Sequence, residues 1–90
     1  MPDTWSVIIL REPEKILARL PRDGRQRLGE AIDQLETDPH PPGSERLTGY
    51  DLYRLRVGDW RIIYRLEADK LLVLVIEIGS RGGIYRSLTR

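Results

Sequence analysis

The sequence predicts an α+β fold with the element order β-α-α-β-β-β, and three observations support this. An apolar, β-branched segment stands at residues 5–10, two segments with helical periodicity follow, and three strand-like segments come after residue 51. We expect the N-terminal strand and the two-helix hairpin to pack on one face of a small, mainly antiparallel, twisted sheet, with a short C-terminal tail or helix. Ninety residues suit one domain and are too few for two, so we expect a single domain across residues 1–90.

The first half of the chain has the signals of one strand and two helices. Residues 5–10 (WSVIIL) are typical of a buried strand, and Pro13 suits the first turn of a helix that begins near Arg11. Pro21 ends this helix, and Asp23 is a suitable N-cap for the next. The predicted apolar faces of the two helices are Ile16, Leu17 and Leu20, and Leu28, Ala31, Ile32 and Leu35.

A stiff polar loop is predicted over residues 37–44, where prolines interrupt the helical pattern. We expect His40, inside this loop, to be a surface residue.

Three strands are predicted in the second half, over residues 52–57, 60–66 and 71–78. Gly58-Asp59 suits a two-residue type II′ hairpin turn, which sets Arg56 opposite Arg61. The side covered by the helices then carries Tyr53, Leu55, Val57, Trp60, Ile62 and Tyr64. The other side, which we call the arginine face, carries Arg54, Arg56, Arg61 and Arg65. Continuing the pairing across the turn at 67–70 adds to the arginine face Leu72, Leu74, Ile76 and Ile78, and assigns Glu77 to the opposite side.

The arginine face is the strongest functional signal in the sequence. Two like charges directly opposite each other destabilise a sheet, so the Arg56–Arg61 pair favours a role in binding an anion. The alternative is that these long side chains simply extend apart into solvent. The net charge of +1 hides an asymmetry: residues 1–45 hold six bases and nine acids, whereas residues 46–90 hold nine bases and five acids.

Composition excludes several other classes of protein. The absence of cysteine excludes disulfides and thiolate zinc sites, and a single histidine cannot build a histidine metal site or a Ser-His-Asp triad. The apolar run at 71–76 is far shorter than the ~20 residues that cross a bilayer, and no signal-like segment is visible at the N-terminus. We therefore expect a cytoplasmic protein without a membrane partner.

Four motifs give the chain its family resemblance. They are Leu47-Thr48-Gly49, the run YRLRVGDWRIIY over residues 53–64, Gly79-Ser80-Arg81 and Ile84-Tyr85-Arg86. Together they resemble the RelE/ParE superfamily, the toxins of type II toxin–antitoxin systems, over nearly the whole chain.

The RelE-like branch of this superfamily implies a ribosome-dependent mRNA endonuclease, or mRNA interferase, that acts in the ribosomal A site without metal or cofactor. A ribose 2′-OH attacks the adjacent phosphate and leaves a 5′-OH end. The resemblance implies catalytic roles for Arg56, Arg61, Arg81 and Tyr85, and RNA contacts by Arg54. We also expect Arg65, on the arginine face, and Arg86, in the basic tail, to bind RNA or another anion. Because arginine cannot be deprotonated in a protein, the general base stays open. Tyr85 is the first candidate, since surrounding positive charge would lower its pKa. Glu77 comes second, since the predicted register places it on the opposite side of the sheet.

The resemblance also implies partners and alternatives. The expected partners are a cognate antitoxin, mRNA and the ribosome, with operator DNA bound only through the antitoxin. An acidic, amphipathic antitoxin segment would suit the arginine face and its neighbouring apolar residues. One alternative is a ParE-like inhibitor of DNA gyrase without nuclease activity. Another is a nucleic-acid-binding accessory domain without toxicity.

Overall fold

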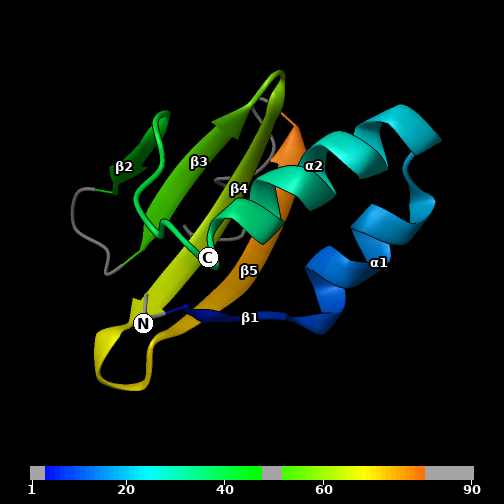
Figure 1. Ribbon diagram of the computed structural model, residues 1–90. Coiled ribbons are helices and arrows are strands. Elements are labelled where there is room, and N and C mark those ends of the chain that lie inside the picture. The colour runs from blue at the N-terminus through cyan, green and yellow to red at the C-terminus, as the bar shows by residue number, and fades with distance from the viewer. Residues whose placement is uncertain (1–3, 48–51, 81–90) are drawn as a thin grey trace.

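The computed structural model describes residues 4–47 and 52–80 and confirms the α+β fold class (Figure 1). Its elements follow the predicted order, with one additional short strand and one turn of 3₁₀ helix. They are β1 (Ser6–Ile9), α1 (Arg11–Arg19), α2 (Arg22–Gln34), β2 (Ser44–Arg46), β3 (Tyr53–Val57), β4 (Trp60–Glu67), η1 (Ala68–Lys70) and β5 (Leu72–Ser80). The predicted C-terminal tail or helix lies outside the described residues.

A five-stranded mixed sheet forms the centre of the molecule, with the strand order β1-β5-β4-β3-β2. The three pairs from β2 to β5 are antiparallel, and β1 lies parallel to β5 at the edge of the sheet. The parallel pair joins strands from the two ends of the described chain, with α1, α2 and the strands β2 to β4 between them. Helix α2 lies across one face of the sheet, and α1 follows the end of β1 and packs against β5 (Figure 1).

The helix boundaries differ slightly from the prediction. Helix α2 begins at Arg22 with Pro21 in the N-cap position, so Asp23 is in the first turn and is not the cap. The fixed φ of proline, here −57°, suits the approach to a helix, and Asp23 still faces the positive end of the helix dipole. Pro13 is buried in the first turn of α1.

The core lies between α2 and the face of the sheet that the sequence assigned to the helices. Its buried members are Leu28, Ile32, Leu35, Leu55, Ile62, Tyr64, Val73, Val75 and Ile78, with the apolar face of α1 and Trp60 packed around them. The alternation along β3 and β4 therefore predicted correctly which side of the hairpin is buried.

The short strand β2 is one element that the sequence did not predict. Only its first residue, Ser44, belongs to the predicted proline-rich loop, and β2 pairs antiparallel with β3 so that Glu45 stands opposite Arg54. Three polar residues carry no alternation that would indicate a strand. The chain is turned into this position at Gly43, which has a φ of +92° that favours glycine.

A β-bulge corrects the predicted register of the last strand. The pairing of β4 with β5 shifts between Ile63 and Tyr64: Ile63 stands opposite Glu77, and Tyr64 stands opposite Val75. This inserts one extra residue, Ile76, into β5. Beyond the bulge the two faces exchange residues, so that Ile78 is buried in the core and Glu77 is on the arginine face. Both assignments are the reverse of the prediction, whereas Leu72 and Leu74 do lie on the arginine face.

Candidate nucleic-acid interface

The β3–β4 hairpin brings the arginine face together as the sequence predicts. Arg56 pairs with Arg61 and Arg54 pairs with Ile63 in the observed register, and Arg65 follows two residues after Ile63 on the same side. The tight turn at Gly58-Asp59 holds this register. Gly58 has a φ of +61° whereas Asp59 has a negative φ, as a type II′ turn requires.

Positive charge is concentrated around Arg54. Its side chain is 23% exposed and forms an ion pair with Glu45 of β2. Burial, followed by the charges of Arg61 and Arg56, lowers the pKa of the Arg54 guanidinium from its usual value. The three guanidinium groups are therefore close enough to repel one another, which is the arrangement expected of a site that awaits an anion.

Arg56 and Arg61 are the two cations of this cluster that keep their charge available. Within residues 4–47 and 52–80, no carboxylate forms an ion pair with either of them. The Nη1 atom of Arg61 donates hydrogen bonds to the carbonyl oxygens of Trp60 at 3.1 Å and Gly58 at 3.5 Å. These bonds hold the Arg61 guanidinium at the hairpin turn and satisfy only part of its five donors.

A polar hollow of about 260 Å³ adjoins the cluster at the edge of the sheet. It is lined by Gly43, Ser44, Glu45, Arg54 and Arg56. Two guanidinium groups beside a hollow of this size can hold a phosphate group through paired hydrogen bonds. The contribution of residues 43–45 was missed at the sequence level, because only the pairing of β2 with β3 brings them to this place.

Arg65 belongs to a different part of the same face. It pairs with Leu74 on β5, and Leu74 pairs in turn with Ile8 on β1. Ile8 is 47% exposed, and Leu74 is partly exposed. This row places an apolar strip beside the basic cluster, formed by Ile8, Leu72 and Leu74.

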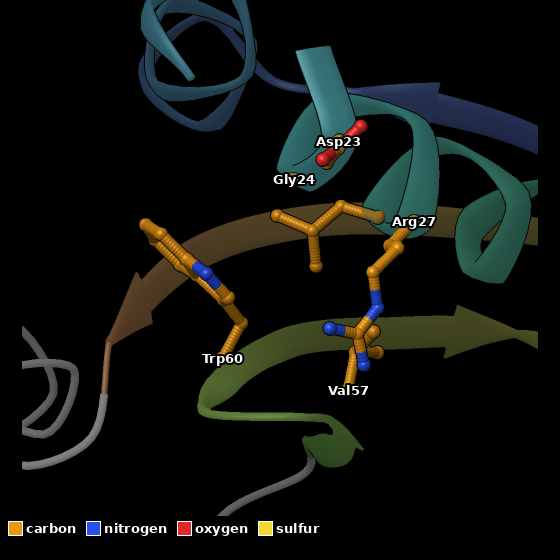
Figure 2. A pocket seen from close by; sticks show the side chains of 6 residues that line it. Asp23, Gly24, Arg27, Val57 and Trp60 are labelled. Atoms are coloured by element: carbon orange, nitrogen blue, oxygen red, sulfur yellow. The ribbon is translucent and has the colours of Figure 1, made fainter. Parts of the chain in front are cut away.

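A second, smaller cavity of about 90 Å³ lies on the opposite side of the hairpin. Figure 2 shows Trp60 and Val57 of the hairpin facing the first turns of α2, with the Arg27 side chain extending from the helix toward the strands. The Arg27 guanidinium lies so close to the turn that a Cβ atom on Gly58 would be 2.9 Å from its Nη2 atom. This cavity belongs to the packing of α2 against the hairpin and does not open on the arginine face.

Three aromatic rings lie together near the proline-rich loop. His40 packs edge-on against Tyr53 with ring centroids 5.1 Å apart, and Tyr53 stacks on Tyr64 at 5.7 Å. The Tyr64 hydroxyl donates a hydrogen bond of 2.8 Å to the carbonyl oxygen of Pro39. Burial raises the pKa of Tyr64 from its usual value. His40 is exposed, as expected, and the rings anchor the loop to the sheet on the side away from the arginines.

The remaining predicted site residues fall outside this description. Arg81, Tyr85 and Arg86 lie outside the described residues, so their position relative to the cluster stays a prediction. In the part of the chain that the structure describes, no group of three or more His, Asp or Glu is placed to hold a metal. No helix of that same part is long and apolar enough to cross a membrane.

Known proteins resemble this chain in both sequence and fold. Residues 6–85 match the family model described as the ParE toxin of the type II toxin-antitoxin system, parDE. A curated relative from Methanocaldococcus jannaschii, named "Putative toxin RelE1", is 31% identical over 87 residues, which make up 92% of this chain and 97% of the relative.

Two solved structures illustrate the similarity of fold. The archaeal RelE-RelB complex from Pyrococcus horikoshii contains a chain with a TM-score of 0.80 and 32% identity, and the match covers 89% of this chain and 98% of that chain. The E. coli RelBE toxin-antitoxin complex contains a chain with a TM-score of 0.73 and 20% identity, and the match covers 84% and 95% respectively. The second match supports the fold alone.

Proposed function

Because the chain belongs to the RelE/ParE superfamily of toxins from type II toxin–antitoxin systems, we propose that it is a ribosome-dependent mRNA endonuclease of the RelE-like type. The observation that supports this function most directly is the arginine cluster of the β3–β4 hairpin. Arg56 and Arg61 stand opposite each other and have no acidic partner among the described residues. Arg56 also lines the polar hollow at the edge of the sheet, together with Arg54.

The proposed reaction is the transfer of a phosphate ester within the RNA strand. The 2′-oxygen of one nucleotide attacks the adjacent phosphorus and the P–O5′ bond breaks, which leaves a 2′,3′-cyclic phosphate and a 5′-OH. A proton leaves the 2′-OH, and another is delivered to O5′.

Arg56 and Arg61 stabilise the negative charge that develops on the phosphate oxygens. Arg54 and Arg65 bind the neighbouring phosphates, and the proposal retains Arg81, Tyr85 and Arg86 in the roles that the resemblance implies. If one of these arginines acts as an oxyanion-hole donor does, it lowers the barrier by about 2–4 kcal/mol.

The proposed partner in the resting cell is a cognate antitoxin. The arginine cluster and the apolar strip of Ile8, Leu72 and Leu74 lie on one face of the sheet. An acidic segment with apolar residues on one side would neutralise the arginine cluster and cover the apolar strip. Such a segment competes with RNA for the same guanidinium groups, which explains how binding would silence the toxin.

The decisive experiment is a translation assay with purified toxin, ribosomes and a defined mRNA, in which new 5′ ends are mapped. We expect cleavage within codons, only when ribosomes are present. Arg61→Ala should slow cleavage by about 100- to 1,000-fold. Arg25→Ala, on the exposed surface of α2, is the matched control and should cleave at the wild-type rate. Full activity of Arg61→Ala would remove the arginine face from the mechanism.

A ParE-like inhibitor of DNA gyrase is the second candidate, because the matching family model is described as a ParE toxin. This function predicts intact mRNA in the same assay and an accumulation of gyrase–DNA complexes. That pair of results would replace the nuclease proposal.

A further inference from the structure

The β-bulge in β5 decides which side chain joins the arginine face. If the pairing seen between Glu67 and Tyr64 continued regularly along β4, Glu77 would stand opposite Ile62 and face the helices. The observed shift between Ile63 and Tyr64 instead sets Glu77 opposite Ile63, on the side that carries the arginines. Bulges commonly redirect a side chain beside an active site. The bulge therefore adds a carboxylate, that of Glu77, to the arginine face.

Glu77 lies within reach of the reaction centre proposed above. Arg54, Ile63 and Glu77 form one row across β3, β4 and β5, so two strand spacings of about 4.8 Å separate the backbones of Arg54 and Glu77. Arg61 pairs with Gly79 and is therefore the diagonal neighbour of Glu77, with the backbones roughly 7–8 Å apart. Ile63, fully buried, lies between the carboxylate and Arg54.

The other carboxylates on this face are already engaged. Glu45 forms an ion pair with Arg54, and the Glu67 carboxylate is 3.9 Å from the Lys70 ammonium. Among the residues that the structure describes, Glu77 is partly exposed and makes no hydrogen bond or ion pair. The charged groups that share its face in the described ranges are Arg54, Arg56, Arg61, Arg65, Glu45 and Glu67.

We propose that Glu77 is the general base of the RNA cleavage, a role that rests on the proposed nuclease function. Its carboxylate accepts the proton of the attacking 2′-OH while the 2′-oxygen forms its bond to phosphorus. The arginines of the cluster cannot take this proton, because a guanidinium stays protonated in proteins. As the P–O5′ bond breaks, O5′ is protonated by a separate donor or by water, so that Glu77 carries one proton at the end of the step.

The test compares Glu77→Gln with wild type in single-turnover cleavage of ribosome-bound mRNA. We expect Glu77→Gln to slow cleavage by about 100-fold or more, since general-base catalysis contributes 10²–10⁴-fold. Glu77→Asp keeps a carboxylate and should recover part of the activity that Glu77→Gln loses. Binding of toxin to ribosomes should be unchanged in both variants.

Glu67→Gln is the matched control, because Glu67 lies on the same face and is engaged with Lys70. It should cleave at the wild-type rate. A Glu77→Gln variant that cleaves as fast as wild type, or a Glu77→Asp variant that is as slow as Glu77→Gln, overturns the assignment while the nuclease function stands. Wild-type toxin that leaves mRNA intact overturns the function and the assignment with it.

Discussion

Replacing Arg56 by glutamine should make the protein more stable and less able to bind RNA. Arg56 stands directly opposite Arg61 in the β3–β4 ladder, and both charges act on the nearby Arg54. Glutamine keeps most of the side-chain length and its hydrogen-bonding capacity while it removes the charge. The change therefore relieves the repulsion that the folded state imposes on the cluster.

The size of the effect follows from the geometry of the pair. Side chains in directly opposed positions have Cβ atoms roughly 4.5–5.5 Å apart, and charged pairs at this position are worth about 0.2–1 kcal/mol. Two repulsions are relieved, but Arg56 is exposed and the solvent screens it. We therefore expect a gain of about 0.5–1 kcal/mol at 10 mM salt. In 1 M salt, where the Debye length is ~3 Å, the gain should disappear.

Urea denaturation followed by tryptophan fluorescence measures this change without adding ions. Arg65→Gln is the control, because Arg65 faces Leu74 and has no arginine opposite it. Reduced stability of Arg56→Gln at low salt would refute the reasoning. So would a gain that persists in 1 M salt, or an equal gain in Arg65→Gln.

Three further substitutions test the packing around the site. Tyr64→Phe should cost about 1 kcal/mol at neutral pH, since it leaves the Pro39 carbonyl without its hydrogen bond. Burial raises the pKa of Tyr64, so its hydroxyl ionises at a lower pH in the unfolded protein than in the folded protein. The free energy of unfolding of the wild type should therefore fall above pH ~10. Circular dichroism melts should show a smaller fall for Tyr64→Phe. Gly58→Ala should destabilise by about 1–2 kcal/mol in urea, because of its φ of +61° and the nearby Arg27 guanidinium. Gly29→Ala, which has open space in the interior of α2, should stabilise by about 0.5–1 kcal/mol, and a loss there would contradict the helix register.

The hairpin at the centre of the arginine face could be predicted from local sequence. Alternation along residues 53–57 and 60–66 assigns each side chain to a face of the sheet. A two-residue turn allows the two strands only one pairing register. The buried side of the hairpin, the opposed Arg56 and Arg61, and the helix-covered core all follow from these two facts.

The positions of Glu45 and Glu77 depended on tertiary structure. Glu45 meets Arg54 because a three-residue strand, too short to show a period, is paired with β3 by the fold of the proline-rich loop. The strand over 71–78 is apolar on both faces, so nothing in its pattern marks where a bulge interrupts the pairing with β4. A single extra residue there exchanges the two faces of the strand.

Periodicity and turn chemistry act between near neighbours, and they were enough to predict the fold class, most of the core and the opposed arginines of the β3–β4 hairpin. Which carboxylates join these arginines depends on strand pairing between distant segments, because that pairing sets the register of residues whose own pattern is uninformative.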